Sequence, residues 1–193
     1  MQQRSEETRT RILEAVMKQI ASKGFSAASV EDICRAAGVS KGAFYHHFAS
    51  KQAVFIELLD TWLSRIDASL EAARQASVPL TLIRMTESLP QIIASASGYL
   101  PVFLEFWLQA SHDETIWGKV IAPYQHYQEY FARLIEEGMA EGSLRPVDPQ
   151  ATAQMIVSLA VGMFLQALVA TKETDWQKMA QQSMEIMMRG LTP

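Results

Sequence analysis

Cysteine is almost missing from this sequence, because Cys34 is the single one among 193 residues. An internal disulfide is therefore excluded, and the chain cannot be a small scaffold held by disulfides. A reduced, cytoplasmic setting is expected, with Cys34 as a small core residue. A secretory leader is not predicted either, since charged side chains interrupt any early apolar run: Arg4, Glu6, Glu7, Arg9 and Arg11.

The residue groupings that catalysis needs are also lacking. No Ser/His/Asp or Cys/His arrangement, metal-ligand spacing or glycine-rich phosphate loop stands out in the sequence. The adjacent His46 and His47 would make a poor metal site, since neighbouring helix residues point about 100° apart. Neither an enzyme nor a cofactor nor a metal is therefore predicted. With 49% hydrophobic and 20% charged residues, the chain can bury a sizeable core.

Negative charge is spread unevenly along the chain, whose net charge is −4. Residues 1–55 contain eight Lys or Arg and five Asp or Glu, a net charge of +3, which leaves a net charge of −7 for the rest of the chain. A polyanion such as DNA would be attracted to the N-terminal part and repelled by the rest. The asymmetry is suggestive, although many ordinary proteins show as much.

One stretch of 18 residues, 153–170, has no charge at all. That length reaches the threshold for a transmembrane helix. Gln154, Ser158 and Gln166 interrupt the stretch, and no aromatic belt or basic flank brackets it. A helix buried in the protein or between subunits is therefore favoured over a membrane span.

The hydrophobic pattern predicts an all-α fold of nine helices and no strand, because nearly every segment has the period of a helix. Breaks are expected at Ser77–Pro79, Gly98–Pro101 and Gly142–Pro149, and Pro123 is expected to kink or divide the helix that contains it. The predicted helices run over Glu6–Lys23, from the N-cap Ser29 to Gly38, from the N-cap Ser40 to His47, from the N-cap Ser50 to Arg74, and over Pro79–Ala96, Pro101–Ser111, Glu114–Glu141, Gln150–Thr171 and Asp175–Arg189.

Two short capped helices joined at Ala37-Gly-Val-Ser40 are typical of a helix-turn-helix, whose second helix can enter the major groove of DNA. Phe44 and Phe48 lie one turn apart and are expected to face inward. The outward positions then hold residues that can donate to phosphates or base edges, or let the backbone approach closely: Lys41, Gly42, Ala43, Tyr45, His46 and His47.

The run from Gly38 to Lys51, GVSKGAFYHHFASK, followed by Gln-Ala-Val-Phe, resembles the signature of TetR-family repressors. The upstream Gly24-Phe25 and Ser29-Val-Glu-Asp-Ile33 are similar to the first two helices of that family. The resemblance covers about the first 60 residues. It implies a TetR-like fold with a three-helix DNA-binding domain over 1–50 and an effector-binding and dimerisation domain over 51–193.

The resemblance also implies residue roles in DNA binding. Lys41, Gly42, Ala43 and His46 match positions that face base edges. A second set matches positions that grip phosphates, Ser29, Tyr45, His47 and Lys51, while Ser40 is expected to cap a helix, contact phosphate, or do both. Taken alone, Tyr45 could be a core aromatic, His47 a solvated surface residue, and Lys51 an ordinary surface lysine.

A homodimer is expected, because one such helix reads only a few base pairs. The resemblance implies that the last two helices of each protomer form a four-helix bundle. The expected interface residues are Ile156, Leu159, Ala160, Met163, Phe164, Ala167, Trp176, Met179 and Met187. The alternative is that these side chains pack into their own chain's core.

Large aromatic and Met side chains are concentrated in the middle helices, where TetR-like proteins hold an effector chamber. The candidate effector-binding residues are Trp62, Met85, Phe103, Phe106, Trp107, Tyr124 and Tyr127, which suit an apolar or aromatic effector, including one with a cation that binds aromatic rings. A stripe of this kind is more often solid core than pocket. Glu105 could be a counter-ion for such a cation. Glu105, Gln109 and His112 nevertheless fall at i, i+4 and i+7, a polar face that could equally meet solvent, and this second interpretation is favoured.

The function implied is a repressor that binds a palindromic double-stranded DNA operator as a homodimer and is released by a small-molecule effector. Activation of transcription stays open. The alternatives are an all-α small-molecule carrier, or a protein that binds DNA without sequence preference.

Overall fold

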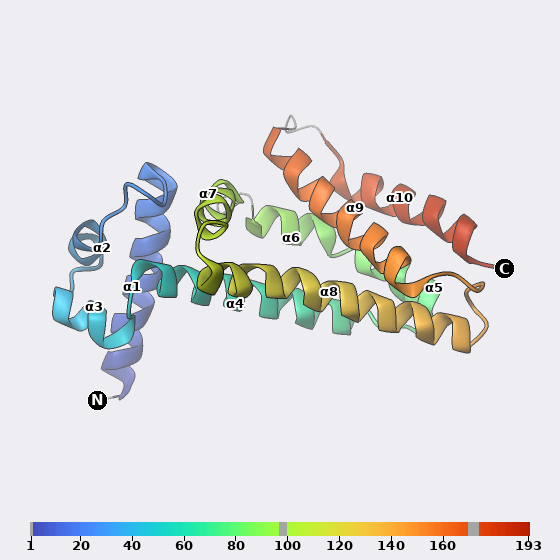
Figure 1. Ribbon diagram of the computed structural model, residues 1–193, viewed down its shortest axis with the longest axis horizontal. Helices are drawn as coiled ribbons and strands as arrows, with labels where there is room; N and C mark the ends of the chain where they lie inside the picture. The colour runs from blue at the N-terminus through green and yellow to red at the C-terminus, as the bar shows by residue number, and fades with distance from the viewer. Residues whose placement is uncertain (1, 97–99, 170–173) are drawn as a thin grey trace. The chain divides into compact units, whose positions relative to one another are not determined.

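A computed structural model describes residues 2–96, 100–169 and 174–193 of the chain. The predicted all-α fold is confirmed, since these residues form helices joined by turns and contain no strand. The predicted end of a helix at Thr171 and the expected break residue Gly98 lie outside the described residues. The helices, labelled in Figure 1, are α1 (Gln2–Lys23), α2 (Val30–Ala37), α3 (Lys41–His47), α4 (Lys51–Ala72), α5 (Val78–Thr86), α6 (Leu89–Ala96), α7 (Leu100–Ala110), α8 (Glu114–Ala140), α9 (Pro149–Val169) and α10 (Trp176–Leu191).

The prediction differs from the structure over residues 79–96, where one helix was expected. The chain instead forms α5 and α6, separated by a turn at Glu87 and Ser88. Pro90 explains the break, because it has no backbone N–H to continue the hydrogen bonding of α5 and fits the first turn of a new helix. The described part therefore holds ten helical segments, or the predicted nine if α5 and α6 are counted as one interrupted helix. Pro123 does not divide α8, which continues through it.

The residues fall into two compact units, which are described separately. The first unit comprises Met1–Ser64 and Gly98–Val120, and the second comprises Arg65–Ser97 and Ile121–Pro193. Both α4 and α8 contribute residues to each unit. The functional division into domains over 1–50 and 51–193 remains a prediction.

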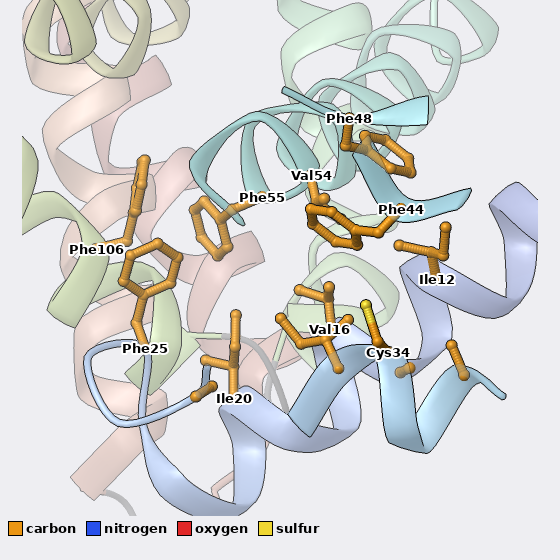
Figure 2. Packing of buried hydrophobic residues seen from close by; sticks show 14 of the residues in the cluster. Ile12, Val16, Ile20, Phe25, Cys34, Phe44, Phe48, Val54, Phe55 and Phe106 are labelled. Atoms are coloured by element: carbon orange, nitrogen blue, oxygen red, sulfur yellow. The ribbon is translucent and has the colours of Figure 1, made fainter. Parts of the chain in front are cut away.

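The core of the first unit is built from α1, α2, α3, α4 and α7 (Figure 2). Three phenylalanines, one from each of three distant segments, pack edge to face or tilted. The ring centroid of Phe106 lies 5.0 Å from that of Phe25 and 4.2 Å from that of Phe55. Phe25 and Phe106 are each about 1% exposed, so α7 is anchored in the same core as the N-terminal helices.

The core of the second unit joins α4, α5, α8, α9 and α10. From α9 it takes Ala153, Ile156 and Val157. Among the described residues α9 is the one helix with the length and composition to cross a membrane, but 28% of its most apolar stretch is buried in the protein. One helix of this kind is weak evidence for a span, because a helix that packs into the core of a globular protein can have the same length and composition.

Candidate nucleic-acid interface

The two helices of the helix-turn-helix begin and end as the sequence predicts. The Ser29 hydroxyl accepts a hydrogen bond from the Asp32 amide at 3.1 Å, and the Ser40 hydroxyl accepts one from the Ala43 amide at 3.1 Å. Gly38 ends α2 with φ 62° and ψ 41°, in the left-handed region that favours glycine. These local caps fix the short turn that separates α2 from α3.

The third helix has one buried and one exposed face. Phe44 is 0% exposed and Phe48 is 4% exposed, so both face the core as predicted. The opposite face holds Lys41, Gly42 and His46, which are exposed, and Tyr45, whose side chain is 55% exposed. Ala43 and His47 are half-buried. The alternative of Tyr45 as a core aromatic is therefore wrong, while the DNA-contact roles stay predictions.

Acidic residues of α2 form ion pairs with lysines on the same surface. The Lys41 ammonium lies 3.1 Å from a carboxylate oxygen of Glu31, and Asp32 is paired with Lys23 at 3.4 Å. The hydrogen bond from Ser29 is the main cause that lowers the pKa of Asp32. Exposed pairs of this kind are worth little in water. Loss of the contact with Glu31 would therefore cost Lys41 little.

Lys51 has a structural role that the sequence did not reveal. Its ammonium donates to the carbonyl oxygens of Phe25 at 2.5 Å and Ala28 at 2.9 Å, and lies 4.5 Å from the centre of the Phe25 ring. The side chain is half-buried, and burial lowers its pKa. Lys51 is thus not the ordinary surface lysine of the alternative reading. A phosphate contact from its remaining proton stays a prediction.

Two further residues of this unit have contacts that the sequence analysis missed. Arg11 of α1 donates to the carbonyl oxygens of Ala37 and, at 2.7 Å, of Gly38, which ties α1 to the turn after α2. Glu105 of α7 accepts hydrogen bonds from the amides of Phe25 and Ser26. Glu105 is thus half-buried and hydrogen-bonded to the turn, a contact that its place on a polar stripe does not predict.

The candidate effector-binding residues are divided between the two units. Trp62, Phe103, Phe106 and Trp107 belong to the first unit, and Met85, Tyr124 and Tyr127 to the second. Phe106 and Met85 are 1% and 7% exposed and pack as core residues. The others are half-buried. Phe103 stacks on Trp107, and Trp107 stacks on Trp117 with ring centroids 6.0 Å apart.

The hydroxyl of Tyr127 bonds to Asp67 of α4. Desolvation by burial, reinforced by that carboxylate, raises the tyrosine's pKa. These contacts describe packed side chains, and a role in binding an effector stays a prediction.

The predicted dimer residues also differ in exposure. Ile156 and Met163 are 5% and 3% exposed within their own chain, and Met179 is 38% exposed. The remaining six, Leu159, Ala160, Phe164, Ala167, Trp176 and Met187, are half-buried. Four large apolar side chains outside the predicted set are exposed on α9 and α10, namely Met155, Val161, Leu165 and Ile186.

These elements define a protein with a helix-turn-helix fixed at both helix starts and at the turn, which is the structure of a DNA-binding regulator. Comparison with known families agrees. Residues 12–58 match the family described as bacterial regulatory proteins, tetR family, and residues 86–191 match the C-terminal part of BetI-type transcriptional repressors. The chain belongs to the TetR family of transcriptional regulators.

Relatives with a known name cover most of the chain. It is 29% identical over 168 residues to the HTH-type transcriptional regulator YfiR of Bacillus subtilis, covering 84% of this chain and 80% of that protein. It is 26% identical over 160 residues to the HTH-type transcriptional repressor DhaR of a Mycobacterium species, covering 81% and 80%.

Solved structures confirm the fold. A TetR transcription regulator from Haloarcula marismortui is similar with a TM-score of 0.81 at 16% identity, over 97% of this chain and all of that one. A transcriptional regulator from Saccharomonospora viridis, solved in complex with choline, is similar with a TM-score of 0.76 at 23% identity, over 97% and 99% of the two chains.

Proposed function

We propose that the protein is a cytoplasmic, homodimeric repressor that binds a palindromic operator and is released from it by a small-molecule effector. One observation carries the proposal: α3 is fixed by Phe44 on its inner side and presents Lys41, Tyr45 and His46 on its outer side. Lysine can contact phosphate or guanine, and tyrosine and histidine can bond to phosphates or base edges. Lys41, Gly42, Ala43 and His46 are the proposed base-facing residues.

The homodimer is supported by apolar side chains that the single chain leaves exposed. On α9 these are Met155, Val161 and Leu165, which are 39–47% exposed, and on α10 Ile186 is 71% exposed. Burying such side chains against a second copy is favourable by roughly 25 cal/mol per Å² of apolar surface. Two-fold pairing through α9 and α10 would also duplicate α3, so that two half-sites one DNA turn, about 34–36 Å, apart can be read together.

The effector is proposed to be apolar or to carry a cation that binds aromatic rings. The stacked rings of Phe103, Trp107 and Trp117 are half-buried and offer the surface that such a cation prefers. The BetI-type match and the choline complex of a structural neighbour make choline the first compound to test. An effector shifts the protein away from its DNA-binding state only by binding another state more tightly.

Selection of binding sites from random double-stranded DNA with the purified chain tests this function. The expected product is a palindrome whose affinity exceeds that of random duplex by about 10³ or more at fixed salt. A protein without sequence preference would select nothing, and a small-molecule carrier would not retain DNA. Choline and other quaternary ammonium or apolar compounds are then added to the operator complex, and one that releases the DNA identifies the effector class.

A further inference from the structure

The turn between α1 and α2, residues 24–28, is held by two side chains of opposite charge. Glu105 of α7 accepts hydrogen bonds from the amides of Phe25 at 2.6 Å and Ser26 at 2.9 Å. Lys51, at the start of α4, donates to the carbonyl oxygens of Phe25 and Ala28. The carboxylate therefore accepts hydrogen bonds from backbone amides of the turn, and the ammonium donates to its backbone carbonyl oxygens. We call Glu105 and Lys51 the turn clamp.

The turn is shaped to admit the carboxylate. Gly24 has φ +82°, and a Cβ atom at this position would lie 2.9 Å from a carboxylate oxygen of Glu105. The positive φ favours glycine here, and a side chain at this position would displace the carboxylate from its present place. The Ser26 amide is the main cause that lowers the pKa of Glu105, and the Phe25 amide and the charge of Lys51 act in the same direction. The acid is therefore ionised at neutral pH.

An apolar contact beside the clamp fixes α7 in place. Phe106 follows Glu105 in the sequence and packs on Phe25 and Phe55 in the core (Figure 2). The clamp and this packing together bind α7 to a turn whose last residue precedes Ser29, the N-cap of α2. A shift of the turn would therefore be passed to the start of α2.

The helix α7 connects the C-terminal region of the chain with the unit that contains the helix-turn-helix. The BetI-type C-terminal match covers residues 86–191 and so includes α7. By its contacts, however, α7 belongs to the compact unit that contains the helix-turn-helix. Together with the first residues of α8, the helix α7 is thus a part of the C-terminal region that packs in the unit containing the helix-turn-helix.

We propose that Glu105 is a positioning residue for operator recognition, through which α7 fixes the start of the helix-turn-helix. When α7 withdraws the carboxylate, two amides of the turn lose their charged acceptor, and α2 and α3 are no longer held in the DNA-binding arrangement. Because coupling between sites is reciprocal, operator binding strengthens the contact of Glu105 with the turn. This inference rests on the proposed function, since it presumes that α3 reads an operator.

Glu105→Gln and the control Glu14→Gln test the inference in the full chain. Each removes one negative charge from the first unit, and Glu14 is exposed on α1. Charge alone predicts that both variants bind DNA more tightly. Positioning predicts that Glu105→Gln binds the selected operator about tenfold more weakly, because an amide offers one acceptor and its NH₂ faces a backbone donor. Fluorescence anisotropy over a range of salt concentrations measures both, and the salt slope should not change, since no phosphate contact is lost.

A second measurement uses the unaltered chain, so it does not depend on the variant's stability. In amide NMR spectra of the deuterated protein, the Phe25 and Ser26 signals should shift together as Glu105 is titrated with acid. Their hydrogen exchange should slow when operator is added.

Two results overturn the inference alone: operator affinity of Glu105→Gln equal to that of Glu14→Gln, or Phe25 and Ser26 signals that ignore pH and operator. If the unaltered chain selects no preferred DNA, the proposed function itself fails and the positioning role falls with it.

Discussion

Gly38→Ala should destabilise the protein more than a chemically identical change at Gly142. Both glycines have positive φ, 62° and 76°, so alanine costs about 1–2 kcal/mol at either position. They differ in their surroundings. A Cβ atom at Gly38 would lie 3.1 Å from the Arg11 guanidinium, whereas nothing lies within 4 Å of one at Gly142.

The extra cost at Gly38 comes from Arg11, which donates to the carbonyl oxygens of Ala37 and Gly38. Hydrogen bonds from charged donors contribute about 1.5–3 kcal/mol, and exposure of Arg11 to water reduces this to about 1 kcal/mol. The expected losses are therefore about 2–3 kcal/mol for Gly38→Ala and about 1–2 kcal/mol for Gly142→Ala.

Urea denaturation followed by circular dichroism measures both losses, and an Arg11→Ala background provides the control. In that background the excess at Gly38 should disappear, because the contact that alanine disturbs is already gone. Equal losses for the two glycine variants, or an excess that persists without Arg11, would refute the reasoning that Arg11 secures the turn.

Two other predictions concern the assembly and the effect of pH. Leu165→Glu should raise the dimer dissociation constant about 100-fold or more, because it places a charge in the proposed α9 interface. The control Leu108→Glu, at a position of α7 that is 69% exposed, should leave the dimer intact. Sedimentation velocity measures both variants, and equal dissociation of the two would contradict the proposed interface. The folded state lowers the pKa of Glu105 and Glu141 from their ordinary value of 4.5, so the stability they contribute is present above about pH 4.5 and is lost as pH falls through their lowered values. Denaturation midpoints should therefore fall on acidification below pH 4.5 and fall less steeply in Glu105→Gln; stability that rises with acid would contradict this sign.

Local features were predictable because their causes lie within a few residues. The N-caps Ser29 and Ser40 act on amides three residues away, and Gly38 has its left-handed conformation within the turn itself. The inward phenylalanines of α3 followed from their spacing of one helical turn. These local features are enough to predict which face of α3 is exposed.

Contacts between distant segments were not predictable, because no local pattern records them. Glu105 and the Phe25 amide are 80 residues apart, and Arg11 and Ala37 are 26 apart. A glutamate that shares a helix face with polar residues three or four positions away is predicted to face solvent, because the sequence does not show its distant partners. The exposed face of α9 was not predictable either. This helix has no charged residue and has apolar residues on every side, so its sequence does not indicate which face is buried.

Repeating the DNA selection with His46→Ala is the most direct test that α3 reads base edges. The unaltered chain should select a palindrome, and the variant should lose its preference at one position in each half-site, the two positions being related by the palindrome's symmetry. Selection of the same sequence with the same base preferences by both proteins would contradict a reading role for His46.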